Sequence, residues 1–123
     1  MMRAAGIILM SPQGRVLMLQ RSPSSDHGSE WCFPGGGIED GETAATAAIR
    51  ECLEETGYAV ETAGDELCTR VADDVHFTTF VRKVDDEFVP RLNDEHVAWA
   101  WVRPEDALAA VLTPAQAAPP AAI

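Results

Sequence analysis

Residues 36–58 read GGIEDGETAATAAIRECLEETGY, and this stretch decides how the rest of the chain is interpreted. Alanine, the strongest helix former, fills most of the positions from 44 to 48. Thr43 is a good N-cap residue after a glycine-rich loop, and Gly57 stands where helices commonly end in the left-handed conformation. We therefore expect one helix from Thr43 to Thr56.

This helix is expected to have two different faces, because residues three and four apart are neighbours on a helix surface. The acidic side chains Glu51, Glu54 and Glu55 share one side, with Arg50 one turn before Glu54. The apolar side, expected to face the core, consists of Ala45, Ile49, Cys52, Leu53 and Thr56.

Three carboxylates on one patch repel one another, and the repulsion grows in a partly dry cleft unless protons or cations neutralise it. Oxygen-only ligands suit Mg²⁺ or Mn²⁺ rather than Zn²⁺, and Mg²⁺ is typically held by a few carboxylates together with substrate phosphates. The acidic face therefore indicates a metal-assisted reaction at a phosphate. The alternative is a solvated helix face, which is the usual role of a run of charges.

The spacing of the surrounding residues favours the first of these interpretations. Gly36 is followed after five residues by Glu42, and after seven more by the segment Arg50-Glu51-Cys52-Leu53-Glu54-Glu55-Thr56-Gly57. This pattern resembles the Nudix box, in which Gly, Glu and an Arg-Glu-x-x-Glu-Glu-x-Gly segment stand at the same distances. Two positions depart from the box, since Cys52 and Tyr58 replace aliphatic residues, but both side chains keep an apolar body.

The resemblance implies an α/β fold, the Nudix α/β/α sandwich, with a mixed β-sheet between helices. It implies an Mg²⁺- or Mn²⁺-dependent, MutT-like pyrophosphohydrolase. Such an enzyme cleaves a phosphoanhydride bond of nucleoside diphosphate derivatives by attack of water on phosphorus. Nucleoside triphosphates and dinucleoside polyphosphates are examples of such substrates, and the expected partner is therefore a small nucleotide-type molecule.

The resemblance also assigns roles to the acidic helix. Glu51, Glu54 and Glu55 become the expected metal ligands and catalytic residues. Either Glu51 or Glu55 would help to deprotonate the attacking water. Arg50, also a catalytic candidate, would orient the glutamates, with Glu42 as its ion-pair partner.

The glycines before the helix are assigned to substrate binding. Gly36 and Gly37 would let the backbone come close to metal and phosphate, because glycine has no Cβ. The carbonyl group of Gly36 is a further expected metal ligand.

Two candidate residues lie outside the box. Glu95 belongs to the segment DEHVAWAWV (residues 94–102), which is similar to the Glu-His-x-x-x-x-Trp segment of the diadenosine tetraphosphate hydrolase branch. We expect Glu95 to be a further catalytic residue, as metal ligand or base; the alternative is a carboxylate of a surface loop. Arg21, at the end of an expected strand, is a candidate phosphate-binding residue, and the alternative is a surface arginine.

No residue identifies a base or a leaving group. Trp99 and Trp101 alternate on one strand face, which is more typical of a core than of a base-stacking platform. His27, in the loop over residues 22–30, is expected to be a plain loop residue.

Composition limits the other classes of function. The 123 residues suit one domain, with residues 113–123 as a flexible tail rich in Ala and Pro. The net charge of −11 speaks against a nucleic acid polymer as partner, and no apolar run is long enough for a membrane span.

Three cysteines, an odd number, indicate reduced thiols in a cytoplasmic protein, with Cys32 and Cys68 as packing residues. Both a monomer and a homodimer are compatible with the sequence.

Strand-like stretches flank the central helix. They cover residues 1–11, 15–21, 31–33, 58–62, 67–72, 75–84 and 97–102. A second helix is expected over residues 105–112, with Pro104 near its first turn. Strands before and after one central helix favour a mixed sheet between helices.

Two alternatives to an enzyme remain. One is a ligand-binding or regulatory module that keeps the fold without the chemistry, and the other is a non-catalytic acidic interaction protein. The complete set of Arg50, Glu51, Glu54 and Glu55 favours the enzyme, because a sensor need not retain every metal ligand.

Overall fold

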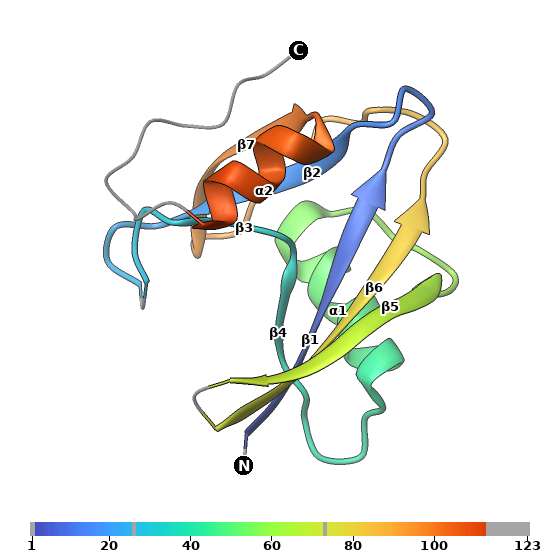
Figure 1. Cartoon of the computed structure of the whole chain (residues 1–123), viewed down its shortest axis with the longest axis vertical. Helices are drawn as coiled ribbons and strands as arrows, with labels where there is room; N and C mark the ends of the chain where they lie inside the picture. The colour runs from blue at the N-terminus through green and yellow to red at the C-terminus, as the bar shows by residue number, and fades with distance from the viewer. Residues whose placement is uncertain (1, 26, 73, 113–123) are drawn as a thin grey trace.

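The computed structural model describes residues 2–25, 27–72 and 74–112. The elements are β1 (Met2–Met10), β2 (Val16–Arg21), β3 (Trp31–Cys32), β4 (Gly35–Gly37), α1 (Ala44–Thr56), β5 (Asp65–Ala72), β6 (Val75–Lys83), β7 (His96–Val102) and α2 (Pro104–Leu112) (Figure 1). The strands form one mixed sheet, in which β1 and β6 are parallel and the other pairs are antiparallel. The expected mixed sheet and both expected helices are therefore confirmed.

The two helices pack on opposite faces of this sheet, because side chains alternate along each strand. The core cluster on the α1 side takes the odd-numbered residues of the first two strands, which are Ala5, Ile7, Leu9, Leu17 and Leu19. The cluster on the α2 side takes Val16 and Met18, together with Val102 and Ala107. The layers are therefore helix, sheet and helix, as the sequence predicts.

The sheet opens between β1 and β2. Among the described residues these strands pair at Met10 and Val16, next to the turn that joins them. Away from the turn, β2 pairs with β3 and β1 pairs with β4. The segment 31–37 thus crosses from the edge of β2 to the edge of β1, and in Figure 1 β4 runs along β1 below β3.

Both ends of α1 lie where the sequence places them. Thr43 is the N-cap, and its side-chain oxygen accepts a hydrogen bond from the Thr46 N–H at 3.1 Å. Gly57 ends the helix in the left-handed conformation with φ 74°, and its N–H donates to the Leu53 carbonyl.

The prediction for the buried face of α1 was partly wrong. Leu53, expected in the core, is 50% exposed, whereas Ala47 and Ala48 are fully buried. Glu55, expected on the acidic outer face, is only 2% exposed. The helix is rotated so that Glu55 points beneath the segment 31–37, where it finds a hydrogen-bond partner described below.

Two strand assignments also differ from expectation. Residues 58–62 form no strand; instead the Tyr58 ring stacks on Phe88 with centroids 4.0 Å apart, so side-chain packing fixes the chain there. The glycines of β4 were expected in a loop, since glycine is a poor strand former. They form a strand because they pair with residues 4–6 of β1.

The aromatic residues of β7 are divided by burial. Trp101 belongs to the core and donates its indole N–H to the Phe88 carbonyl at 3.0 Å, as expected for a core residue. Trp99, on the same face, is 37% exposed.

Cys68 of β5 is exposed, so its expected packing role was wrong.

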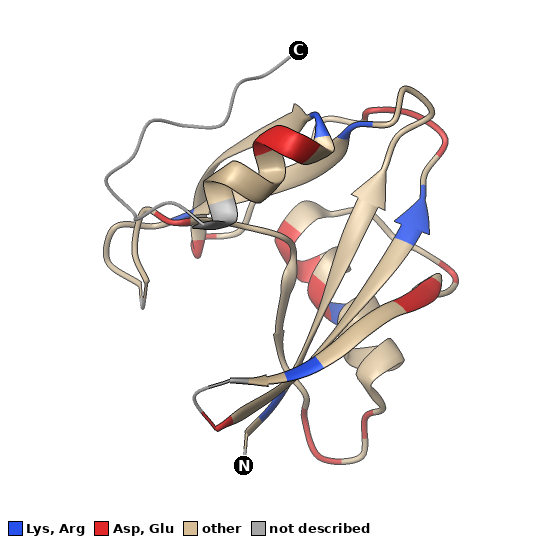
Figure 2. Cartoon of the chain, in the orientation of Figure 1, with Lys and Arg blue, Asp and Glu red and all other residues tan. Residues whose placement is uncertain are grey.

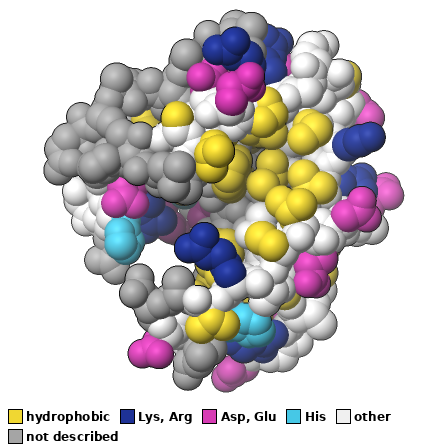
Figure 3. Space-filling model, viewed as in Figure 1, with side chains coloured by type: hydrophobic (Ala, Val, Ile, Leu, Met, Phe, Trp, Pro, Cys, Tyr) yellow, Lys and Arg dark blue, Asp and Glu magenta, His cyan; other side chains and the backbone are white. Residues whose placement is uncertain are grey.

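The face of the sheet turned away from α1 is only partly covered by α2. Hydrophobic side chains gather there over β1 and β6 (Figure 3). Phe77 contributes to this surface, and Gly6 leaves room for its ring, since a Cβ at that position would lie 3.3 Å from it. Within the described residues, no helix has the length and apolar character needed to cross a membrane. The expected tail, residues 113–123, lies outside the described residues.

Candidate active site

The guanidinium group of Arg50 is the centre of the acidic cluster. Its Nε and Nη2 atoms donate to the two carboxylate oxygens of Glu42, at 2.7 and 3.0 Å. Its Nη1 atom donates to Glu51 at 2.8 Å and to Glu54 at 3.2 Å. The expected Arg50–Glu42 ion pair is therefore confirmed, and it is bidentate, which fixes the plane of the guanidinium group.

These contacts join the helix to the loop before it. Arg50 also donates through Nη2 to the carbonyl oxygen of Gly37 at 3.0 Å. Hydrogen bonds from Arg50 lower the pKa of Glu42 to about 2, and Glu42 in turn raises the pKa of Arg50. Figure 2 shows the acidic positions on α1 and on the loop that leads into it. The arginine thus holds several anions in one place.

Glu55 lies beneath the crossing segment rather than in solvent. Its carboxylate accepts a hydrogen bond from the backbone N–H of Gly35 at 2.9 Å. Burial raises the pKa of Glu55, and the nearby charge of Glu51 raises it further. A carboxylate in such a place is poised to take up a proton or to bind a cation.

Glu51 lies against the backbone of Gly36. A Cβ at Gly36 would stand 2.6 Å from the carboxyl carbon of Glu51, so no other residue fits without moving that side chain. Burial raises the pKa of Glu51, whereas the hydrogen bond from Arg50 lowers it. A Cβ at Gly37, in contrast, would meet no atom within 4 Å. A Cβ at Gly36 would therefore displace a box glutamate, whereas a Cβ at Gly35 would meet the backbone oxygen of Ala5 at 2.6 Å.

Glu95 lies on the loop just before β7 and is exposed. Its charge is a smaller influence on the pKa of Glu55, which burial raises most. The side chain of the next residue, His96, lies with its Nε2 atom 3.8 Å from Cys32 Sγ in the crossing segment, and the same segment binds Glu55 through the Gly35 N–H. The structure thus brings Glu95 toward the box glutamates.

Arg21 approaches the site from the end of β2. Burial raises the pKa of Cys32 to about 12, and Glu55 raises it further, whereas the charge and a hydrogen bond of Arg21 act against this rise. Burial, with a contribution from Arg21, lowers the pKa of His96 to about 4. Arg21 therefore belongs to the surroundings of Cys32, His96 and Glu55. His27 is exposed, as expected for a loop residue.

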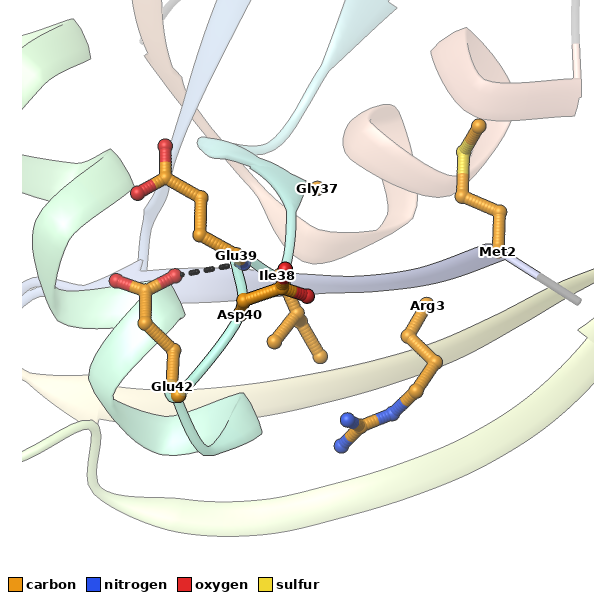
Figure 4. A pocket seen from close by; sticks show the side chains of 8 residues that line it. Met2, Arg3, Gly37, Ile38, Glu39, Asp40 and Glu42 are labelled. Atoms are coloured by element: carbon orange, nitrogen blue, oxygen red, sulfur yellow. Dashed lines mark hydrogen bonds between the residues drawn. The ribbon is translucent and has the colours of Figure 1, made fainter.

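A shallow pocket of about 480 Å³ borders the site on the side of the glycine loop. Its lining consists of Met2, Arg3 and residues 37–42 (Figure 4). Figure 4 shows the Glu39 and Glu42 side chains pointing away from Arg3. The pocket shares Gly37 and Glu42 with the acidic cluster, but the three helix glutamates do not line it.

The donor set fits Mg²⁺ or Mn²⁺, because carboxylate and carbonyl oxygens at Glu51, Glu54, Glu55 and Gly36 are hard ligands. In the part of the chain that the structure describes, no three Asp, Glu, His or Cys side chains are placed as a metal cluster. Glu51 and Glu54 instead accept hydrogen bonds from Arg50, and Glu55 accepts one from the Gly35 N–H. The chain supplies suitable ligands, and Arg50 holds two of them.

Several features of the site were not found from the sequence. The Gly35 N–H, Cys32 and the buried ring of His96 all lie around Glu55 or Glu95, yet none belongs to the pattern of the box glutamates. The one available signal was the position of His96 directly after Glu95 in the Glu-His segment.

The chain is similar in sequence to known pyrophosphohydrolases. The RNA pyrophosphohydrolase of Dinoroseobacter shibae is 40% identical over 90 residues, which is 73% of this chain and 51% of that protein. This chain spans about half or less of the length of the RNA pyrophosphohydrolases that it matches. The CTP pyrophosphohydrolase of Escherichia coli is 31% identical over 111 residues, covering 87% of this chain and 80% of that protein.

Solved structures share the fold. A C. elegans Ap4A hydrolase binary complex superposes with a TM-score of 0.75 and 25% identity, covering 89% of this chain and 86% of that one. The E. coli dihydroneopterin triphosphate pyrophosphohydrolase has a TM-score of 0.76 at 24% identity, covering 90% and 86%, and supports the fold alone. The family model described as NUDIX domain matches residues 1–122. With that match, and with every fixed residue of the box present, the chain belongs to the NUDIX domain family.

Proposed function

We propose that the chain is an Mg²⁺-dependent pyrophosphohydrolase that cleaves a phosphoanhydride bond of small nucleoside diphosphate derivatives by attack of water on phosphorus. The observation that carries this proposal is the Arg50 cluster, which gathers Glu42, Glu51 and Glu54 around one guanidinium group. A solvated helix face has no need of a bidentate clamp of this kind, and neither does a purely acidic interaction surface.

Each residue of the cluster has a separate task in this proposal. Glu51, Glu54, Glu55 and the Gly36 carbonyl group would hold the metal. When bound, the metal would offset the negative charge of the diphosphate and make a water molecule more acidic. Arg50 orients Glu51 and Glu54, and it ties them to the glycine loop through Gly37.

We assign proton uptake to one of two neighbouring carboxylates, the half-buried Glu51 or the buried Glu55. Glu51 and Glu55 are close enough for each to affect the pKa of the other. Glu55 is the more deeply buried, and burial raises the proton affinity of its carboxylate, which suits a group that accepts a proton from water once a bound cation keeps it ionised. We therefore assign the base to Glu55, with Glu51 as its neighbour in the metal site.

The proposed substrate is a small nucleotide rather than a nucleic acid polymer. The relatives bear the names of enzymes for RNA, CTP and Ap4A, so the names alone leave the size of the substrate open. A net charge of −11 opposes the approach of a long polyanion, whereas a short diphosphate with its cation brings far less charge. Arg21 is the proposed phosphate contact. We further propose that residues 1–123 act as one cytoplasmic domain, as a monomer or a homodimer.

The test is a hydrolysis assay with purified full-length chain and a panel of nucleotides. The panel holds nucleoside triphosphates, oxidised nucleotides, dinucleoside polyphosphates, ADP-ribose, nucleotide sugars and a 5′-triphosphorylated RNA. We expect turnover of at least one small nucleotide with Mg²⁺ or Mn²⁺, loss of turnover with a chelator, and recovery when metal is restored. Turnover that persists without metal would contradict the proposed chemistry, and turnover of the RNA alone would contradict the proposed substrate.

A metal-binding readout supports the same test without a substrate. Because a ligand that binds the folded chain alone raises its stability, Mg²⁺ or Mn²⁺ is expected to raise the melting temperature. Glu54→Gln is expected to reduce this rise. The matched control is Glu61→Gln, which makes the same change at an exposed position after α1 and is expected to leave the rise intact.

A further inference from the structure

The turn that carries Glu95 is organised around the side chain of Asn93. Its Oδ1 atom accepts a hydrogen bond from the backbone N–H of Glu95 at 3.2 Å. The same oxygen lies 3.3 Å from Nδ1 of His96. One amide oxygen therefore contacts both residues of the Glu-His pair that follows it.

These contacts determine the tautomer of His96. A backbone N–H can only donate, so the Asn93 atom beside Glu95 is its oxygen, and an amide oxygen can only accept. Nδ1 of His96 must then carry the proton that it shares with Asn93. In the neutral ring Nε2 is bare, and it lies 3.8 Å from Cys32 Sγ, whose S–H can donate to it. His96 is 4% exposed, so water does not compete for either nitrogen.

The backbone of Glu95 is also held from the other side. The N–H of Ser22 donates to the Glu95 carbonyl oxygen at 2.8 Å. Asn93 therefore fixes the N–H of Glu95 while Ser22 fixes its carbonyl. Among the residues that the structure describes, no hydrogen bond fixes the Glu95 carboxylate within this turn, and its charge contributes to the raised pKa of Glu55, after burial.

We propose that Asn93 and His96 are positioning residues that hold Glu95 beside the box glutamates. Cys32, His96 and Asn93 form a chain of hydrogen bonds that ends at the Glu95 N–H. The chain starts at Cys32 in the crossing segment, whose Gly35 N–H donates to Glu55 of α1, and it ends at Glu95 in the loop before β7. It therefore links the Glu95 turn to the segment that contacts Glu55. The kinetic part of this inference rests on the proposed function, because it assumes that Glu95 assists hydrolysis.

The first experiment does not depend on any activity. Long-range ¹H–¹⁵N spectra of the ¹⁵N-labelled full chain distinguish the two neutral tautomers of histidine. The His96 signals are assigned by their loss in His96→Gln. We expect His96 to be protonated on Nδ1, and we expect this preference to be lost in Asn93→Ala. A ring protonated on Nε2 in the unmodified chain would overturn the inference.

The second experiment is a double-mutant cycle on the best substrate of the panel. If Asn93 acts through Glu95, Asn93→Ala lowers kcat roughly tenfold or more in the unmodified chain, as is typical of groups that orient active-site ligands. The same change then has almost no effect in a Glu95→Gln background, because the group that it positions is already disabled. Asn93→Asp keeps an oxygen acceptor and is expected to retain most of the rate.

The controls separate positioning from folding. Asp94→Asn changes an exposed neighbour in the same loop and is expected to keep the full rate. Melting temperatures show that each variant is folded at the assay temperature. Equal losses from Asn93→Ala in both backgrounds, or a fully active Glu95→Gln, would overturn the positioning role. A chain that hydrolyses no member of the panel would contradict the proposed function, and the tautomer measurement would still decide the inference.

Discussion

The carboxylate of Glu55, on α1, accepts a hydrogen bond from the backbone N–H of Gly35 at 2.9 Å. This contact joins α1 to β4 through two residues that are 20 positions apart in sequence, and Glu55 is only 2% exposed. The side chain is therefore both a structural link and a candidate base. A change that keeps the link but removes the charge separates these two roles.

Glu55→Gln is such a change. The amide oxygen can still accept from Gly35, so we expect the fold to persist. The hydrolysis rate should fall roughly a hundredfold or more, as for loss of a proton acceptor. The melting temperature without metal should rise by a few degrees, because an amide carries no charge to desolvate beside Glu51. Hydrolysis rates with Mg²⁺ check the first effect, and melting curves in chelator check the second. Glu61→Gln is the control for both. If Glu55→Gln were fully active at saturating Mg²⁺, Glu55 would not be part of the active site.

Adjacent glycines offer a matched pair. Gly36→Ala should displace Glu51, because the new Cβ would stand 2.6 Å from its carboxyl carbon. Gly37→Ala places its Cβ where no atom lies within 4 Å. We therefore expect Gly36→Ala to lose at least roughly tenfold in rate, by analogy with other groups that orient ligands, and Gly37→Ala to lose less. Equal losses in kcat/KM for the two variants would show that the contact with Glu51 is unimportant.

Arg50→Lys keeps the positive charge but loses the planar guanidinium group with its several N–H donors. A lysine cannot contact both oxygens of Glu42 while it also reaches Glu51, Glu54 and the Gly37 carbonyl, so the cluster should come apart. We expect a rate loss of roughly tenfold or more and a lower melting temperature. Arg103→Lys is the control, since Arg103 pairs with Asp106 at 3.0 Å on α2, outside the cluster. Similar behaviour of the two variants would argue against the central role of Arg50.

A pH dependence of stability is expected from Glu87. Hydrogen bonds from Arg15 lower its pKa, and a further one comes from the Ser11 hydroxyl at 2.8 Å. A carboxyl group whose pKa is lowered by folding stabilises the protein above its unfolded pKa, and this contribution disappears as pH falls through the folded value. Glu87→Gln should therefore cost about 1 kcal/mol at pH 7, after allowance for solvent screening.

In acid, the stability difference between Glu87→Gln and the unmodified chain serves as the control. Below the unfolded pKa of roughly 4.3 the difference between Glu87→Gln and the unmodified chain should shrink, and it should vanish once Glu87 is protonated in the folded state. Chemical denaturation across a pH series measures it. A difference that stays constant down to pH 2 would mean that packing, rather than charge, explains the effect.

Local signals in the sequence were sufficient for some of these features. Thr43 and Gly57 fix the ends of α1 because capping depends on neighbouring residues alone. The Arg50–Glu42 ion pair could be expected because the resemblance supplied a partner at a fixed spacing. The mixed sheet with two helices followed from the order of the strand-like and helical stretches.

Other features depend on contacts between distant segments. Helical periodicity predicted Glu55 outside and Leu53 inside, because periodicity contains no information about the Gly35 N–H, which donates to Glu55 from a distant strand. Likewise, the glycines of β4 have no strand propensity and gain their conformation only by pairing with β1. The contact between His96 Nε2 and Cys32 Sγ, which joins β7 to β3, was equally invisible to local patterns.

The pairing of β1 with β2 at Met10 and Val16 joins two parts of the sheet, which we call leaves. The first leaf contains β1 and β4, and the second contains β2, which ends at Arg21, and β7, which follows Glu95. The brace across the opening is α1, since its Ala48 and Cys52 share one core cluster with Leu9 of the first leaf and Leu17 of the second. The helix that carries the glutamates is thus also the part that sets the angle between the leaves. Loosening its buried side would misalign the two sets of site residues before it unfolded either leaf.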